Sequence, residues 1–171
     1  MLGLYENFPK TVHKRTSFAT SISNKRLQQA LIQTFQKINN ENFNLERIAN
    51  PSVPQCTVIL EFGIAEANNF NYLNTEETNK MLKVIQKKPF QVMDFFCALR
   101  YYKMQNGKKT PLRFDYYMMR FIFNKNSMEM EIQIFHERGP RYVSPEDIAN
   151  FVVNEIGETF SRKILKAVKP L

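Results

Sequence analysis

Basic and aromatic side chains alternate along the middle of the chain, where they could bind an unpaired nucleic acid. Seven basic residues lie between residues 100 and 125, with Asp115 as the single acid. Cations neutralise phosphates, and exposed aromatic rings stack on unpaired bases. The candidate contact residues are Arg100, Lys108, Lys109, Arg113, Phe114, Tyr116 and Arg120, with Lys10, Lys14 and Arg15 from a basic N-terminal stretch. The alternative is that a helix covers these aromatic residues and that the lysines form a solvated hairpin tip.

A histidine and an aspartate could form a second kind of site. If residues 112–123 and 128–137 pair as a hairpin, His136 lies opposite Asp115 at its open end. Such a pair can act as a general base with its orienting carboxylate. No nucleophile stands at a recognisable spacing from it, so we favour a hydrogen-bonded structural pair. The basic loop that follows, with Arg138 and Arg141, could bind an anion, although the acids in the next helical turn would compete with that anion.

Metal and nucleotide chemistry find little support in the sequence. Cys56, Cys97, His13 and His136 are the cysteines and histidines of the chain, and none of them stand at the close spacing of a zinc site. Neither the GxGxxG nor the GxxxxGK[ST] motif occurs, which argues against a phosphate-loop enzyme. We therefore expect no metal and no cofactor, and an enzyme is the less expected class.

The composition is typical of a basic globular domain. The length of 171 residues fits one domain, and 43% hydrophobic residues supply a core, which excludes a wholly disordered chain. Lysine and arginine number 24 against 16 acids, for a net charge of +8. Two cysteines are too few for a disulfide scaffold. No apolar run approaches the roughly 18 residues of a membrane span, so we expect no membrane partner and a cytoplasmic location.

Residues 1–20 are expected to form a basic N-terminal arm, and residues 21–171 a single domain. Glu6 is the one acid before Glu41, whereas basic residues recur throughout this stretch. The apolar segment of a secretory signal is missing between Met1 and Thr20. An ordered arm is favoured over an organellar transit peptide, because arginine is sparse and a helix is predicted directly after it.

Hydrophobic periodicity predicts three helices. The first covers residues 24–38, with apolar residues at three- and four-residue spacing. The second covers residues 74–88, where Asn74 and Glu77 form a capping box. The third begins after Ser144, with Pro145 in its first position, and its apolar stripe extends to Ile164.

Alternating apolar residues predict four strands, at 56–64, 70–73, 112–123 and 128–137. Residues 90–104 fit either a strand or a helix, and the Asn106-Gly107 dipeptide that follows favours a strand entering a hairpin. Between 112–123 and 128–137, a four-residue connection at 124–127 sets Phe123 opposite Met128 and Arg120 opposite Glu131. Opposite charges at this last pair favour that register.

These elements predict an α+β protein, with a mostly antiparallel sheet of four to five strands and about three helices in a two-layer sandwich. The leading functional hypothesis is a non-enzymatic protein that binds nucleic acid, RNA or another single strand, through the basic and aromatic surface. The alternative is a small subunit or adaptor of a multiprotein assembly, because aromatic residues, methionine and arginine are also enriched at protein interfaces. The chain has 15 Phe and 8 Met, which fits both hypotheses.

Overall fold

The computed structural model of the chain describes residues 1–50 and 55–168, so residues 51–54 and 169–171 of the expected domain lie outside it. The described residues form three α-helices and one antiparallel sheet of nine strands, an α+β architecture. The long strands are β3 (Cys56–Glu66), β5 (Val92–Gln105), β7 (Asp115–Asn124) and β8 (Glu129–Arg138). The others are β1 (Lys14–Thr20), β2 (Asn42–Asn44), β4 (Asn69–Tyr72), β6 (Lys108–Pro111) and β9 (Leu165–Ala167).

The sheet is larger than the predicted four to five strands. Its order is β2-β3-β5-β7-β8-β1-β9, with β4 paired to β3 and β6 paired to β5. Three of the additional strands have only three or four residues, too few to show alternation. The fourth, β1, has the sequence KRTSFAT, whose polar residues hide the pattern of a strand. Residues 14–20 therefore belong to the sheet, and only residues 1–13 form an arm.

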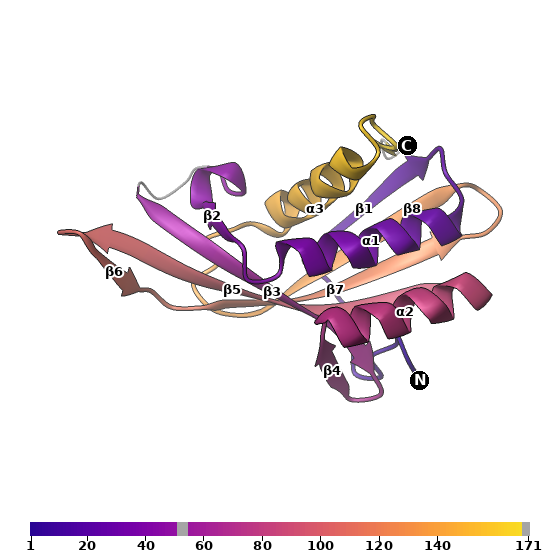
Figure 1. Cartoon of the computed structure of the whole chain (residues 1–171), viewed down its shortest axis with the longest axis horizontal. Helices are drawn as coiled ribbons and strands as arrows, with labels where there is room; N and C mark the ends of the chain where they lie inside the picture. The colour runs from indigo at the N-terminus through magenta and orange to yellow at the C-terminus, as the bar shows by residue number, and fades with distance from the viewer. Residues whose placement is uncertain (51–54, 169–171) are drawn as a thin grey trace.

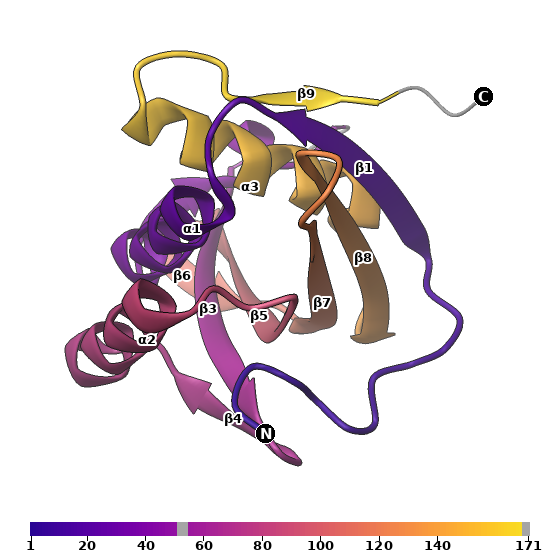
Figure 2. The ribbon, with the colours of Figure 1, turned by 90° about the vertical axis from the view of Figure 1, so that its right-hand side faces the viewer.

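The three helices lie on one side of the sheet, which curves around them (Figures 1 and 2). They are α1 (Asn24–Ile38), α2 (Thr75–Lys87) and α3 (Pro145–Thr159), and Ser23, Asn74 and Ser144 cap their N-termini. Phe35 of α1 stacks on Phe62 of β3, with ring centroids 4.0 Å apart, and meets Phe95 of β5 edge-on. The apolar alternation of the strands thus places one residue in two against the helices.

Residues 90–104, which fit either a strand or a helix in the sequence, form most of strand β5. Gln105 pairs with Lys108 across a two-residue turn. Asn106 and Gly107 both have positive φ angles, of 50° and 76°, as a type I′ turn requires. The prediction of a strand entering a hairpin is therefore confirmed at this dipeptide.

The register of the β7–β8 hairpin differs from the predicted one by two residues. Phe123 pairs with Met130, and Arg120 pairs with Gln133 rather than with Glu131. The turn lies one residue later than expected at each end, because Asn124 still pairs with Glu129 and its side chain accepts a hydrogen bond from the Asn126 N–H. A shift of two residues preserves the side-chain period of the strand. The predicted faces of both strands are therefore correct, although the predicted pairs are wrong.

The third helix ends earlier than its apolar stripe predicts. Helix α3 stops at Thr159, and Ser161 adopts a positive φ of 53° that reverses the chain. Ile164 and Leu165 are buried because the returning chain packs on the core and continues into β9. The apolar residue Ile164 therefore continues the helical spacing of α3 in the sequence, although it lies beyond the turn that ends the helix.

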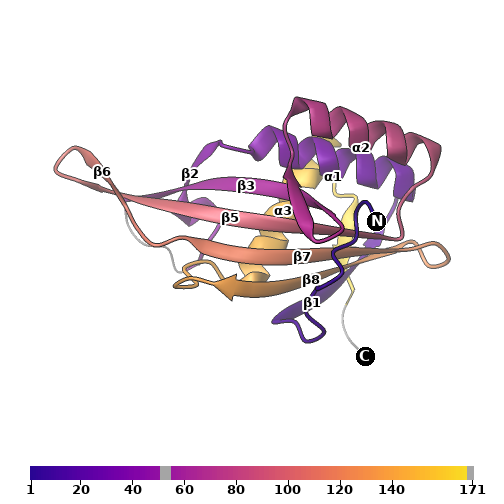
Figure 3. The same cartoon turned by 90° about the horizontal axis from the view of Figure 1, so that it is seen from below.

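Among the described residues no helix lies on the outer face of the sheet, and residues 1–13 cross it instead (Figure 3). The arm starts between the diverging ends of β3 and β5. There the Gly3 N–H donates to the Ala65 carbonyl and the Gly3 carbonyl accepts from the Asp94 N–H, both at 2.7 Å. The arm reaches β8 at His13, whose N–H donates to the Ile134 carbonyl. The first residues of the chain therefore bridge two strands and hold the arm on the sheet.

The loop after β8 depends on Gly139. Its φ of +116° is a conformation that side chains rarely adopt, and a Cβ there would lie 2.2 Å from the Phe114 carbonyl oxygen. We predict that Gly139→Ala lowers the free energy of unfolding by about 3 kcal/mol, because it adds backbone strain and a backbone collision. Urea denaturation measures this loss.

Gly157→Ala is the matched control for Gly139→Ala. Gly157 lies in helix α3, and a Cβ there would have its nearest neighbour at 3.9 Å. Helix propensity predicts an unchanged stability or a gain of up to about 1 kcal/mol. An equal loss for the two variants would contradict the close approach of the loop to β7.

Candidate nucleic-acid interface

A row of five aromatic rings crosses the outer face of the sheet. Successive ring centroids are 4.8, 5.5, 5.6 and 6.1 Å apart, so each ring contacts the next. We call this set the aromatic row, and its members, in spatial order, are Tyr5, Phe70, Phe96, Tyr116 and Phe114. All five are partly exposed. The row therefore offers ring faces and edges to a partner.

Sequence reasoning found only Phe114 and Tyr116 of the aromatic row. Strand alternation could have added Phe96, which shares its face of β5 with Arg100. No local signal points to Tyr5 or Phe70, because the arm and the β3–β4 hairpin meet these rings only through tertiary contacts. The structure thus joins segments that are more than 60 residues apart in the sequence.

Arg138 extends the row with a cation. Its guanidinium lies 4.4 Å from the centroid of the Tyr116 ring, a cation–π contact. The β7–β8 ladder shifts register between Tyr116 and Tyr117, so that Glu137 has no residue opposite it. A bulge of this kind re-aims side chains, and here both Glu137 and Arg138 line the outer face.

Three of the predicted basic contact residues lie in or next to the β5–β6 hairpin, which projects beyond the rest of the sheet (Figure 1). Lys108 and Lys109 are exposed in β6, and Arg113 is exposed in the segment that leads into β7. The Lys109 ammonium lies 5.2 Å from the centroid of the Tyr102 ring. These three predicted contact residues remain accessible to a phosphate.

Two predicted contact residues are already engaged within the protein. The Arg100 guanidinium lies 2.6 Å from the Glu61 carboxylate and also donates to the Asn40 side chain. Arg120 forms two hydrogen bonds to the fully buried Asp94 carboxylate, at 2.7 and 2.8 Å, and the Phe8 ring covers its guanidinium at 4.3 Å. Arg120 therefore neutralises a buried acid beneath the arm.

The basic residues of the N-terminal stretch have different surroundings. Lys10 is exposed in the arm. Lys14 lies 3.9 Å from Glu146, and Arg15 lies 3.9 Å from Glu131, both at the outer limit of an ion pair. Acidic side chains on α3 and β8 therefore offset part of the positive charge of this stretch.

Asp115 and His136 meet inside a closed hydrogen-bond network. The fully buried Asp115 carboxylate lies 2.8 Å from His136 Nε2 and accepts hydrogen bonds from the Tyr101 hydroxyl and from the N–H groups of Arg141 and Tyr142. Burial raises the pKa of the Tyr101 phenol far above its usual range, so that the phenol donates as a neutral hydroxyl. Every strong acceptor position of the carboxylate is used. This arrangement fixes the loop after β8 and leaves little capacity to move a proton.

His13 stacks beside this network. Its ring lies 4.8 Å from the Phe135 ring, and its Nδ1 accepts a hydrogen bond of 2.9 Å from the His136 N–H. Burial lowers the pKa of the His13 imidazole, and the nearby Arg141 and His136 lower it further. The neutral ring is the form that can accept this bond.

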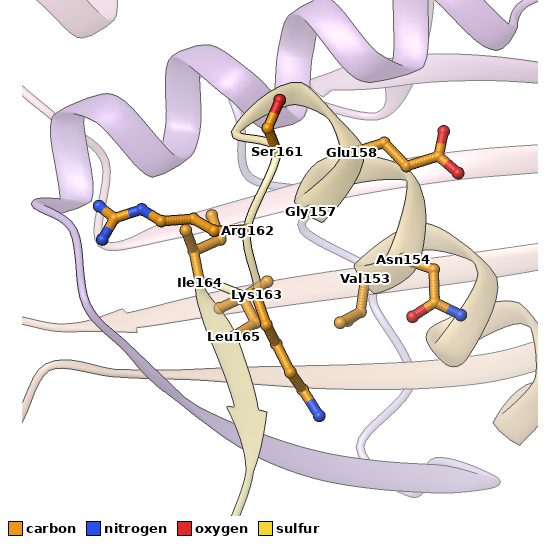
Figure 4. Close-up of a pocket in the computed structure, with 9 residues that line it drawn as sticks. All are labelled: Val153, Asn154, Gly157, Glu158, Ser161, Arg162, Lys163, Ile164 and Leu165. Atoms are coloured by element: carbon orange, nitrogen blue, oxygen red, sulfur yellow. The ribbon is translucent and has the colours of Figure 1, made fainter.

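An open depression of about 670 Å³ lies between the end of α3 and the chain leading to β9 (Figure 4). Arg162, Lys163 and Glu158 line it together with apolar and small residues. Among residues 1–50 and 55–168, no three His, Cys, Asp or Glu side chains are placed to hold a metal ion. Burial raises the pKa of the Cys97 thiol well above its usual value, which opposes a nucleophilic role.

Comparison of the chain with protein-family models, with curated proteins and with solved structures finds no match. Within the described part of the chain, no helix has the length and apolar character to cross a membrane.

The Asp94–Arg120 pair generates a stability prediction. Asp94→Asn is expected to lower the free energy of unfolding by about 3 kcal/mol, because it leaves the covered guanidinium of Arg120 without its counter-charge. Denaturation by urea at neutral pH measures the loss.

Glu61→Gln is the matched control. Glu61 also pairs with an arginine, Arg100 of β5, but both side chains of this pair are partly exposed. Surface pairs contribute little, so this variant should lose less than about 1 kcal/mol. A loss for Asp94→Asn no larger than that of the control would refute the structural role of the buried pair.

His13 generates a prediction about pH. Its pKa is lower in the folded chain than in the unfolded chain, whose histidines titrate near about 6.5. Its contribution to stability is therefore complete above about pH 6.5 and is lost as the pH falls toward the folded pKa. His13→Phe retains a stacking ring but cannot titrate. The difference in urea midpoint between pH 7.5 and pH 5.5 should be smaller in this variant than in the wild type, and an identical difference would contradict the prediction.

Proposed function

We propose that the protein binds single-stranded nucleic acid, RNA in particular, through the outer face of its sheet. The observation that carries this proposal is the aromatic row, which runs over a helix-free sheet face and ends beside the cation of Arg138. Base stacking on aromatic rings of an open sheet is a common mode of recognition for unpaired RNA. Duplexes hide the faces of their bases, so the same surface would discriminate against them.

The charge distribution supports the same partner. Lys108, Lys109 and Arg113 are exposed near the end of the sheet where Arg138 lies, because the start of β7 pairs with the end of β8. A backbone that follows the row would therefore meet cations at this end. The opposite half of β8 presents Glu129 and Glu131, which would repel a phosphate. We infer a path that runs from the β5–β6 hairpin along the row toward Tyr5.

We propose a binding function without catalysis. Asp115, the acid nearest to a histidine, is saturated with hydrogen bonds. Cys56 and Cys97 are free and buried, which suits a reducing compartment, and the cytoplasm is the proposed location.

A second candidate function is that of a subunit in a protein assembly. Ile59 and Ile122 are half-buried apolar residues on the same outer face. Apolar side chains that stacking does not need favour a protein partner over a nucleic acid. Light scattering of the purified protein distinguishes a self-assembling chain from a monomer.

The reversal of three cations tests the nucleic-acid proposal. We predict that the triple variant Lys108→Glu, Lys109→Glu, Arg113→Glu binds a single-stranded RNA 20-mer at least about tenfold more weakly than the wild type, because three phosphate contacts are lost. Fluorescence anisotropy at two salt concentrations measures the affinity. The salt dependence should also decrease, since fewer counterions are released.

The matched control makes the same charge change on the helical side, with Lys83→Glu, Lys87→Glu and Lys88→Glu. These lysines are exposed at the end of α2 and in the residue after it. The control should keep most of its affinity. Equal losses in the two triple variants would mean that the RNA responds only to net charge, which would overturn the proposed interface and favour the protein-assembly function.

A further inference from the structure

A small pocket interrupts the aromatic row near its arm end. It has a volume of about 420 Å³ and is open to solvent. Its lining comes from the arm, the β3–β4 hairpin, β5, β7 and the end of β8. The eight lining residues are Tyr5, Asn68, Asn69, Phe70, Phe96, Met118, Glu137 and Arg138. Residues from five segments thus converge on one hollow of the outer face.

The walls of the pocket are suited to a flat ring. Phe70 contacts both Tyr5 and Phe96, at centroid distances of 4.8 and 5.5 Å, and the planes are tilted by about 40°. Tilted rings leave an opening wider than a stacked pair would, and Met118 adds a polarizable thioether at the same place. A planar heterocycle could therefore lie against aromatic faces without displacing the core.

The polar groups of the pocket differ from those of the rest of the row. Asn68 and Asn69 are exposed in the tight turn between β3 and β4, where they bring amide donors and acceptors. Glu137 is the one anionic residue among the eight, and Arg138 beside it is the one cation. The bulge in β8 is the reason that two successive side chains line the same hollow.

We infer that this pocket holds one unpaired nucleobase of the bound strand and that it prefers guanine. This inference rests on the proposed function, because it assigns the base specificity of the same surface. Guanine presents two adjacent N–H donors on its Watson–Crick edge, which a carboxylate can accept together as a charge-assisted pair. Adenine, cytosine and uracil each present an acceptor nitrogen or oxygen beside their donor. The Glu137 carboxylate would repel that acceptor, which gives discrimination against the wrong bases.

The neighbouring cation completes the site. Arg138 lies over Tyr116 and is exposed, so its guanidinium can meet the phosphate next to the inserted base. The positive charge of Arg138 also reduces the repulsion between the Glu137 carboxylate and the phosphates of the bound strand. The pocket therefore combines a stacking wall, a guanine-reading carboxylate and a phosphate-binding arginine.

The experiment compares three fluorescein-labelled RNA octamers by anisotropy: eight uridines, and the same strand with one central guanosine or one central adenosine. We expect the wild type to bind the guanosine strand about tenfold more tightly than the other two. Glu137→Gln removes the charge and one acceptor position, so the preference for the guanosine strand over the uridine strand should fall below about threefold. Phe96→Leu keeps an apolar side chain without a ring and should weaken all three strands by about fivefold to tenfold.

Ile122→Ala is the control, because Ile122 lies half-exposed on the same face outside the pocket. It should bind all three strands as the wild type does, and circular dichroism confirms that each variant is folded. Equal affinity of the wild type for the three strands would overturn the pocket assignment and leave the proposed function standing. No binding of any strand by the wild type would overturn both. A guanine preference that survives Glu137→Gln would also overturn the assignment, since another group would then read the base.

Discussion

One buried ion pair holds the open side of this sheet together. Asp94 has no contact with solvent on a face that carries no helix, and the paired Arg120 neutralises its charge. The same carboxylate accepts a hydrogen bond of 2.7 Å from the Tyr5 N–H, so it also anchors the arm. The arm in turn lays Phe8 over the guanidinium and brings Tyr5 into the aromatic row. An isolated buried charge costs several kcal/mol. The Asp94–Arg120 pair therefore stabilises the arm and the sheet together.

A second buried carboxylate, on the helix-facing side of β7, organises the opposite end of the sheet. Asp115 gathers the loop after β8 through two backbone N–H groups, and Gly139 lets that loop approach closely. The loop is continuous with the bulge that carries Glu137 and Arg138. Buried groups therefore fix the positions of the polar side chains of Glu137 and Arg138. The two carboxylates are similarly buried, but their hydrogen-bond partners differ. Asp94 binds a guanidinium, whereas Asp115 binds neutral donors and a histidine ring.

Local sequence patterns predicted the helices and strands more accurately than they predicted which residues pair between them. The helix at 24–38 and the cap at Asn74 follow from spacing and side-chain chemistry that lie within a few residues, and both are present. The faces of the β7–β8 hairpin were also predictable, whereas its register was not, because a shift of two residues exchanges partners without exchanging faces. Arg120 was matched with Glu131 for this reason. Its actual partner, Asp94, lies 26 residues away on another strand, and no sequence pattern joins them. For the same reason, two members of the aromatic row, Tyr5 and Phe70, could not be recognised as one surface.

The position of β1 has a consequence for how the chain is made. Lys14 pairs with Ile134, so this strand is synthesised early and must wait for more than a hundred residues before its partner exists. Pairing over such a separation closes a long loop, which slows folding. A strand that waits unpaired is at risk of joining another chain. The hydroxyls and cations of KRTSFAT reduce that risk. The polar sequence that conceals β1 as a strand is thus also what would protect the nascent chain from aggregation at the ribosome.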